Sequence, residues 1–308
     1  KVLVTKNQDE CNTLQLLANR ASENNIDATW LTKSELDKKD THAKTVNSAL
    51  WIAETSVFDP KQVLKTLIDQ LINHPNATVA FDTAFIKKVD DNKILTTNGE
   101  VSFDHLINAA GGYADKIAHE FDIAKHLTLI PFKGLYKKVV PKIASKIKHH
   151  IYPVPDLENP FLGVHFTRSA AGDVYAGPTA IPAFGPENYG IFEKIGLDSL
   201  KILSKDAILF LANKKFRRVA LSEPKRYIHS FFYNEAKQLV TQLAPSDLIP
   251  CQKIGIRPQL VDWQSKELVM DFNIQHHQNH THILNAISPA FTCCFAFAKH
   301  ICKHYLNI

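Results

Sequence analysis

Two adjacent glycines, Gly111 and Gly112, follow the short apolar segment HLINAA at residues 105–110 and precede a helical pattern, YADKIAHEF, at 113–121. A strand, a glycine turn and a helix in this order are typical of a nucleotide-binding turn. A residue without Cβ lets the backbone approach a phosphate, and the helix N-terminus favours anions. The pattern G-x-G-x-x-G of dinucleotide-binding folds occurs nowhere in the chain. The alternative is that the glycines only make a tight turn between a strand and a helix.

Two further residues carry side chains that could act on a small substrate, one by binding a carboxylate and one by accepting a proton. Arg257 lies in GIRPQ, residues 255–259, and a guanidinium fork can hold a carboxylate by two parallel hydrogen bonds. The alternative for Arg257 is a surface ion pair. His165 lies in the apolar segment LGVHFT, residues 162–167, and a histidine can accept a proton near neutral pH. The alternative for His165 is a hydrogen-bonded residue of the core.

A third group of polar residues, HHQNHTH at 276–282, has the composition of a metal site. No carboxylate or cysteine completes a recognisable ligand spacing, and the segment lies at a turn signal. We therefore expect no metal in this protein.

Local patterns predict the elements that position these residues. The clearest helix is 59–75, because Asp59 can cap it, Pro60 suits its first position and its apolar residues recur on one face. Asn98-Gly99, between two short extended segments, predicts a β-hairpin. Residues 127–180 are expected to be rich in strands and residues 191–245 mainly helical.

We expect further strands at 1–5, 48–58, 77–83, 84–89, 93–97, 100–103 and 105–110, and further helices at 9–23, 32–39, 234–245 and 290–305. The last of these helices is expected to bury Phe291, Cys294, Phe295, Ala298, Cys302 and Tyr305, which recur at helical spacing.

Composition limits the class of protein. The 308 residues are 45% hydrophobic and 22% charged, which is ordinary for a soluble globular protein of one large or two smaller domains. The net charge of +5 comes from dispersed lysines that suit a solvated surface. Attraction of an acidic small molecule or of an anionic membrane surface are the alternatives. No motif or pattern of basic and aromatic residues indicates a nucleic-acid partner.

The cysteines and the start of the sequence are also informative. Five cysteines without a C-x-x-C pattern argue against a disulfide framework and a thiolate zinc site, so we expect a reducing, cytoplasmic location, with peripheral attachment to the inner membrane as an alternative. No apolar run is long enough to span a membrane. The first residue is Lys and the single methionine is Met270, so we expect the sequence to be part of a longer polypeptide.

Several segments together resemble the D-amino-acid oxidase superfamily of FAD enzymes, and most closely its L-2-hydroxyglutarate dehydrogenase/oxidase family. They are VFDP (57–60), INAAGGYADKIA (107–118), PFKGLY (131–136), IYPVPDLENPFLGVHFT (151–167), GPTAIPAF (177–184), GIRPQLVD (255–262) and LNAISPAFT (284–292). The resemblance implies an α/β fold, in which an incomplete FAD-binding Rossmann-like domain is interleaved with an α+β substrate domain built on a mixed sheet. By this resemblance, residues 57–125 and 248–308 form the FAD-binding domain, and residues 1–56 and 126–247 form the substrate domain.

The resemblance also assigns residues to the site. The residues that contact FAD would be Ala110, Gly111, Arg257, Ser288, Pro289, Ala290 and Thr292. Gly112 is less certain, because the family more often has a larger residue there, and capping of the last helix is the alternative role of Ser288. Lys133, Tyr136, Tyr152, Thr179 and Arg257 would contact a substrate with two carboxylates, with packing at a strand edge as the alternative for Lys133 and the two tyrosines.

The implied reaction is oxidation of L-2-hydroxyglutarate to 2-oxoglutarate, with the hydride passing to flavin and the electrons to a quinone or to oxygen. His165 would take the hydroxyl proton. The segment G-x-G-x-x-G with which such proteins begin has no counterpart here, so we expect a separate N-terminal FAD-binding piece as a partner. The alternatives are a non-catalytic remnant that binds no flavin, or a related FAD oxidase acting on an amino acid or on glycerol 3-phosphate.

Overall fold

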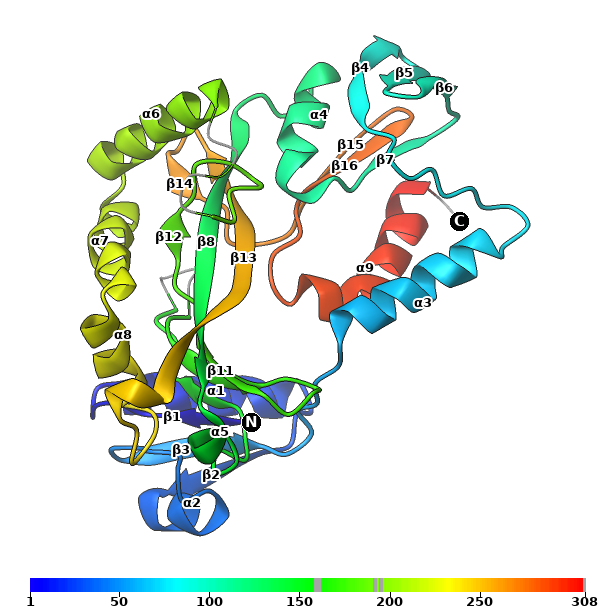
Figure 1. Ribbon diagram of the computed structural model, residues 1–308. Helices are drawn as coiled ribbons and strands as arrows, with labels where there is room; N and C mark the ends of the chain where they lie inside the picture. Colours follow the sequence, from blue (N-terminus) through cyan, green and yellow to red (C-terminus); the bar gives the residue numbers. More distant parts are fainter. Residues whose placement is uncertain (158–161, 191–192, 194–195, 307–308) are drawn as a thin grey trace. The chain divides into compact units, whose positions relative to one another are not determined.

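The computed structural model describes residues 1–157, 162–190, 193 and 196–306, and the chain divides into two compact units (Figure 1). Unit 1 consists of Lys1–Ala77, Lys133–Ile181 and Lys215–Gly255, and unit 2 of Thr78–Phe132, Pro182–Lys214 and Ile256–Ile308. The boundaries of these units, which are defined by contacts, differ from those of the FAD-binding and substrate domains expected from the resemblance. The division into those two domains therefore stays a prediction.

Unit 1 is built on strands from distant parts of the sequence. Its elements are β1 (Val2–Val4), α1 (Glu10–Glu23), β2 (Ala28–Thr32), α2 (Lys33–Lys39), β3 (Ser48–Ile52), α3 (Pro60–Ile72), α5 (Pro141–Ala144), β9 (Ile151–Pro153), β10 (His165–Arg168), β11 (Val174–Gly177), α7 (Lys214–Ser222, from the last residue of unit 2), η2 (Glu223–Tyr227), α8 (His229–Ala236) and η3 (Pro245–Asp247). Three strands, β8 (Leu127–Val139), β12 (Ile181–Pro182) and β13 (Leu248–Asp262), belong partly to each unit.

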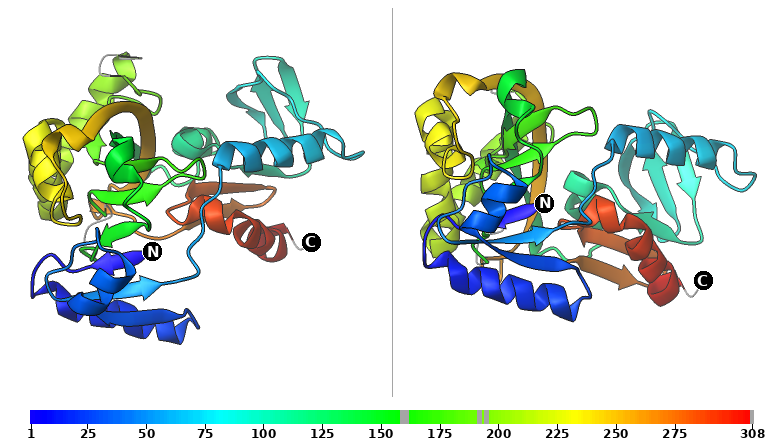
Figure 2. Two further views of the ribbon diagram at one scale, coloured as in Figure 1. Left: turned by 60° about the horizontal axis from the view of Figure 1, so that its bottom comes forward. Right: turned by 90° about the horizontal axis from the view of Figure 1, so that it is seen from below.

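The main sheet is mixed, with the strand order β14-β13-β8-β11-β10-β9-β1-β3-β2, in which β14 is Glu267–Leu268. Strand β12 pairs with β8. β1 is parallel to β9 and antiparallel to β3. Helix α1 lies along β2 and β3, and its buried Leu14 packs against Leu50 and Val154 (Figure 2). The main apolar core of the described part of unit 1 includes Phe166, which is fully buried on β10 next to the predicted site residue His165.

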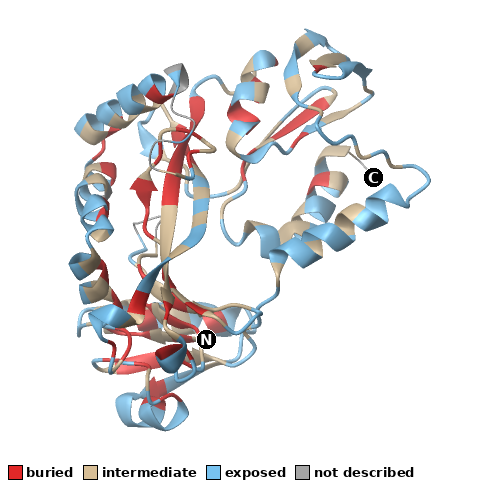
Figure 3. Ribbon diagram, in the orientation of Figure 1, coloured by how far each residue is buried: buried red, intermediate tan, exposed pale blue. Residues whose placement is uncertain are grey.

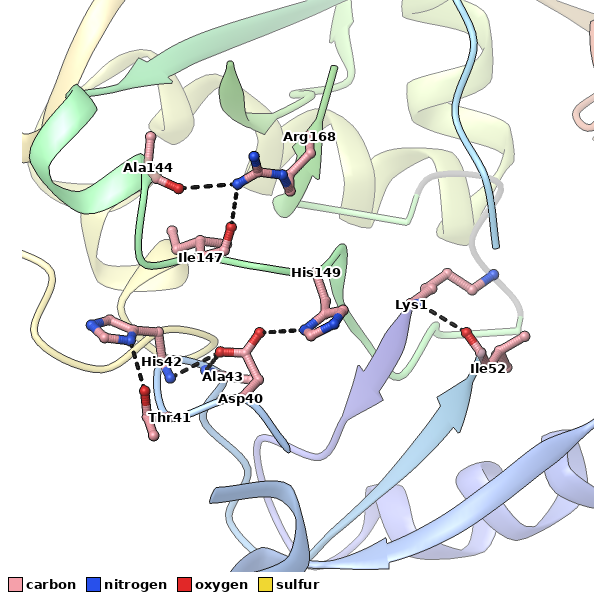
Figure 4. A network of polar contacts seen from close by, with 10 residues as sticks. All are labelled: Lys1, Asp40, Thr41, His42, Ala43, Ile52, Ala144, Ile147, His149 and Arg168. Atoms are coloured by element: carbon pink, nitrogen blue, oxygen red, sulfur yellow. Dashed lines mark hydrogen bonds and ion pairs between the residues drawn. The ribbon is translucent and has the colours of Figure 1, made fainter. Parts of the chain in front are cut away.

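A polar network fixes β9 and its preceding loop (Figure 4). Asp40 is almost fully buried, and its carboxylate accepts hydrogen bonds from the backbone N–H groups of His42 and Ala43. The same carboxylate pairs with His149 Nδ1 at 2.9 Å. Because three donors hold this buried carboxylate, the loop is fixed at His149, three residues before Tyr152.

Strand β10 is anchored by its last residue. The Arg168 guanidinium donates through Nη1 to the carbonyl oxygens of Ala144 and Ile147, at 3.2 and 2.7 Å (Figure 4). A charged donor shared by two backbone acceptors makes strong hydrogen bonds. His165, at the other end of the same strand, therefore lies on a well-anchored element.

Unit 2 contains two small sheets besides its share of the main one. Its elements are β4 (Phe85–Asp90), β5 (Lys93–Thr96), β6 (Gly99–Ser102), β7 (Leu106–Asn108), η1 (Gly111–Tyr113), α4 (Ala114–Glu120), α6 (Leu197–Ala212), β14 (Glu267–Leu268), β15 (Asn273–His277), β16 (His280–Asn285), η4 (Ala290–Cys293), α9 (Cys294–Ile301) and η5 (Cys302–Leu306). The first sheet is the meander β4-β5-β6 and the second has the order β15-β16-β7. Helix α4 contacts β16, and its Ala114 and Ala118 pack with Leu284 in the core of this unit (Figure 1).

Several local predictions are confirmed. Helix α3 begins at Pro60, and the side chain of Asp59 accepts a hydrogen bond from the Lys61 backbone N–H. The predicted hairpin joins β5 to β6, where Gly99 has a positive φ of 110° that suits glycine. The mixed α/β fold is confirmed as well.

Other local predictions are wrong, and tertiary contacts explain one of them. The helix expected at 234–245 ends at Ala236, because Leu239 and Val240 instead pair with the backbone of Lys44 and Ala43. Residues 77–83 are not a strand, and Phe81 and Asp82 form a turn, with Asp82 at a φ of 51°. Strand β3 ends at Ile52, and residues 53–58 are not a strand.

The prediction that the last helix is buried on one face is also wrong. It consists of three short segments, η4, α9 and η5, and Phe295 is 67% exposed and Phe291 40% exposed. Ile301, rather than the predicted residues, is the buried position of α9. The apolar stripe of α3 forms as predicted but is not buried either, since Leu64, Leu71 and Ile72 are about half exposed (Figure 3).

Candidate functional site

Apart from Arg257, which lies on β13, the predicted cofactor residues of unit 2 follow two strands of the β15-β16-β7 sheet. β7 and β16 are parallel neighbours, with Asn108 opposite His282. β7 leads into the turn with Ala110 and Gly111, and β16 leads into the turn with Ser288 and the residues after it. Two predicted segments that are far apart in sequence therefore leave the carboxyl ends of adjacent parallel strands, which is where open α/β sheets bind their ligands.

Gly111 has the conformation and surroundings of a close-approach position. Its φ is +55°, and a Cβ placed on it would meet no heavy atom within 4 Å. Ala110 and Gly111 are both exposed. Gly112 differs, because a Cβ there would lie 3.3 Å from Pro186. The open space thus lies in front of Gly111 and not of Gly112.

The second turn presents small polar groups. Ser288, Pro289 and Thr292 are exposed, and Ala290 is half-buried. The Thr292 hydroxyl donates to the Pro289 carbonyl at 2.8 Å, which fixes the first turn of η4. The N-cap of η4 is Pro289, without a side-chain hydrogen bond, so a neighbour of Ser288 rather than Ser288 itself takes the capping position. Two exposed turns with open space at Gly111 fit a nucleotide cofactor whose phosphates lie against backbone.

The polar residues beneath the first turn are not among those predicted from the sequence. Asn108 and His282 are buried at 4% and 0% exposure, and the Asn108 amide bonds to the His282 ring. Nearby, the Thr281 hydroxyl is hydrogen-bonded to His105 Nε2 at 3.0 Å and to His276 Nδ1 at 2.9 Å. The sequence offers two signals for them. Asn108 is the last residue of β7, and His280, Thr281 and His282 are three consecutive polar residues at the start of β16. Within the described residues, no group of three His, Cys, Asp or Glu side chains is arranged to hold a metal ion.

In unit 1, His165 and Tyr152 lie together. Their rings stack at a centroid distance of 4.2 Å and an interplanar angle of 18°. His165 Nδ1 is 2.9 Å from the Gly163 carbonyl oxygen. Because a carbonyl only accepts, Nδ1 carries the proton and the neutral ring has its lone pair on Nε2. The structure therefore sets His165 in the tautomer that a general base requires at Nε2.

The other predicted substrate residues of unit 1 differ in exposure. Lys133 is 3% exposed on β8, and Tyr136 is half-buried with the Lys253 ammonium 4.9 Å from its ring centroid. Thr179 is buried, and its hydroxyl accepts from the Leu135 N–H at 3.0 Å. Tyr136 and Thr179 line a cavity of about 190 Å³.

Arg257, predicted to contact both cofactor and substrate, lies in unit 2 on β13 and is exposed. Its neighbours Ile256 and Pro258 are half-buried and line a different cavity of about 300 Å³ together with Gly112 and Asp115. Because side chains alternate along a strand, Arg257 points away from the face that carries Ile256 and Pro258.

Replacing Thr179 by Val separates the two roles open to this residue. The Leu135 N–H would lose its acceptor, and we expect the free energy of unfolding to fall by about 1 kcal/mol in urea titrations. If Thr179 also contacts substrate, KM rises in addition. An unchanged KM with lower stability would assign the hydroxyl to the strand edge alone.

Comparison with known proteins gives consistent matches over the whole chain. The model of the DAO family, described as FAD dependent oxidoreductase, matches residues 1–304. L-2-hydroxyglutarate dehydrogenase of Indibacter alkaliphilus is 31% identical over 100% of this chain and 77% of its own length. The mitochondrial enzyme of the same name from Caenorhabditis elegans is 29% identical over 100% of this chain and 73% of its own length.

Solved structures show the same fold. L-alpha-glycerophosphate oxidase from Mycoplasma pneumoniae with FAD bound aligns with a TM-score of 0.66 at 20% identity, over 100% of this chain and 72% of that one. Glycine oxidase from Bacillus cereus aligns with a TM-score of 0.58 at 14% identity, over 97% of this chain and 72% of that one.

Proposed function

This chain belongs to the DAO family of FAD dependent oxidoreductases, and from that premise we propose that it oxidises L-2-hydroxyglutarate to 2-oxoglutarate. The observation that carries the proposal is the similarity, over the full chain, to relatives named L-2-hydroxyglutarate dehydrogenase. Bound FAD supplies the acceptor for the hydride that leaves C2 of the substrate.

In this proposal, His165 Nε2 takes the proton of the substrate hydroxyl. The hydrogen bond from Nδ1 to the Gly163 carbonyl supports this role, because it keeps the proton off Nε2. Stacking on Tyr152 fixes the plane of the ring. Loss of the C2 hydride without removal of the hydroxyl proton would leave a protonated ketone, so a positioned base lowers the barrier.

The two substrate carboxylates need cationic or hydroxyl partners. We assign Arg257 and Lys133 to this task, with Tyr136, Tyr152 and Thr179 as hydroxyl contacts. The exposed guanidinium of Arg257 supports bidentate binding of one carboxylate. Desolvation of Lys133 on β8 would strengthen its attraction for an anion.

The cofactor contacts are assigned to Ala110, Gly111, Arg257, Ser288, Pro289, Ala290 and Thr292. The open space in front of Gly111 and the backbone N–H groups at the start of η1 and η4 support these contacts. A side chain at position 111 would be strained at a φ of +55° and would fill that space.

A separate N-terminal FAD-binding piece is the proposed protein partner. Unit 2 supports it, because β7 is the last strand of its sheet among the described residues and Ile107 on it is 45% exposed. Phe295 and Phe291 add exposed apolar surface in the same unit. A quinone or oxygen is the proposed electron acceptor.

We further propose a reducing, cytoplasmic location, with peripheral attachment to the inner membrane as the alternative. The five cysteines are unpaired by disulfides, which suits a reducing compartment. None of the described helices combines the length and the apolar character needed to cross a bilayer.

The test begins with the visible spectrum of the purified chain before and after addition of FAD. Flavin bands that remain with the protein through gel filtration, and that bleach when L-2-hydroxyglutarate is added without oxygen, are the expected result. D-2-hydroxyglutarate, glycerol 3-phosphate and glycine serve as control substrates. Retained flavin that only glycerol 3-phosphate or glycine bleaches would refute the substrate assignment, and no retained flavin would refute activity of this chain alone.

A further inference from the structure

Asn108 occupies the inside of the turn that carries Gly111. Its Oδ1 accepts a hydrogen bond from the Ala110 backbone N–H at 3.2 Å, and its Nδ2 donates to the Ala114 carbonyl at 2.8 Å. A single amide thus ties down the turn on both sides of Gly111. Because a backbone N–H only donates and a carbonyl only accepts, these two contacts fix which end of the amide is oxygen and which is nitrogen.

The second N–H of the same amide points to the neighbouring strand. Asn108 Nδ2 is 2.9 Å from His282 Nδ1, which must therefore accept and carry no proton. His282 Nε2 then carries the proton and donates to His280 Nδ1 at 2.9 Å. The donors therefore run in one direction, from Asn108 to His282 and from His282 to His280, and each role follows from the backbone partners of Asn108.

Burial keeps His282 in the neutral state that this arrangement needs. His282 is fully buried and Phe121 packs against its ring at 5.3 Å between centroids. Burial, and then the neighbouring His280, lower the pKa of His282 to about 4. The ring is therefore neutral at physiological pH, and Nδ1 can accept.

We propose that Asn108 and His282 are positioning residues for the cofactor site, which hold the Ala110–Gly111 turn in the conformation that receives the phosphates of FAD. The inference rests on the proposed function for its ligand. The set of hydrogen bonds from Asn108 to Ala110, Ala114 and His282, called the clamp below, is a property of unit 2. Neither side chain contacts the cofactor in this proposal. Both act through the backbone of the turn.

The test compares variants that change the clamp with one that does not. His282→Leu removes the acceptor at Nδ1, His282→Asn restores an acceptor at a similar place, and Asn108→Asp keeps the shape of the side chain but removes both donors. Thr281→Val is the matched control, since Thr281 is equally buried on β16 and contacts His105 and His276 rather than Asn108.

The first readout is hydrogen exchange of the Ala110 amide, resolved by NMR or by fragmentation in a mass spectrometer, without FAD. We expect exchange about tenfold faster in His282→Leu and in Asn108→Asp, near the original rate in His282→Asn, and within twofold of it in Thr281→Val. Equal rates in His282→Leu and Thr281→Val would overturn the clamp. If His282→Leu does not fold, Asn108→Asp decides the same question.

The second readout is the dissociation constant for FAD, from quenching of flavin fluorescence. We expect about tenfold weaker binding in His282→Leu and recovery in His282→Asn. Faster exchange without weaker binding would overturn the link between clamp and cofactor. Absence of FAD binding in the unsubstituted chain would count against the proposed function, while the exchange rates still decide whether the clamp exists.

Discussion

Replacing His165 by Asn is expected to lower kcat with L-2-hydroxyglutarate by about 10³-fold, within the range that a general base contributes. The Asn amide can still donate to the Gly163 carbonyl at the place of Nδ1, so the fold of β10 should be retained. What is lost is the lone pair at the position of Nε2. Steady-state kinetics at saturating FAD measure the change, and KM should change far less than kcat.

His229→Asn is the control for this substitution, because His229 is half-buried at the start of α8 and bonds only to the Pro245 carbonyl among the contacts described for it. Its kcat should stay within twofold. A second sign of a base is the pH profile, since the fall of kcat/KM on the acid side should disappear in His165→Asn. A variant with nearly normal kcat would instead make His165 a packing partner of Tyr152.

The accuracy of the sequence-based predictions depends on the range of the interactions that decide each element. The cap at Asp59 acts over two residues, and α3 begins where that signal places it. The structure likewise shows Thr32 capping α2 over three residues, next to the start expected for that helix. The segment after Ala236 also has a helical pattern, but its backbone pairs with residues nearly 200 positions earlier. Such a contact leaves no mark in a local window.

The same distinction applies to the site. Gly111 could be recognised because its role depends on its own backbone and on the strand before it. The tautomer of His165 is set by Gly163, two residues away. The contact between Asn108 and His282 joins residues 174 positions apart, so only the strand pairing of β7 and β16 reveals it.

The buried histidine of unit 2 makes its stability depend on pH. The pKa of His282 is about 4 in the folded chain, lowered first by burial and then by His280, and 6.5 is the ordinary value. Between these values the unfolded chain binds a proton that the folded chain does not, so stability falls as the pH falls from about 7 towards 4. The full effect is about 3 kcal/mol, of which about 2 kcal/mol is lost by pH 5.

Asp206 on α6, also in unit 2, opposes this dependence. Burial raises its pKa to about 7 from 3.8, so the folded chain binds a proton there that the unfolded chain does not. Acid therefore favours folding through Asp206 over nearly the same interval in which it disfavours folding through His282. Burial also lowers the pKa of His280 and His105, which act with His282. The slope of the unsubstituted chain is the sum of these opposing contributions, so the contribution of a single residue appears only in variants.

We therefore expect His282→Leu and Asp206→Asn to change the pH dependence of unit 2 in opposite directions. Urea unfolding at pH 7.5 and pH 5 should show His282→Leu gaining about 2 kcal/mol on acidification relative to the unsubstituted chain, and Asp206→Asn losing stability. Trp263 is the tryptophan of unit 2, so a background with Trp30→Phe and Trp51→Phe makes its fluorescence report on that unit alone. Parallel pH dependence in all variants would mean that the His282 ring is protonated equally in the folded and unfolded chains. Such a ring would be protonated at pH 5 in the folded chain too, and because a protonated ring has no lone pair to receive the amide, the Asn108 contact would then be lost at that pH.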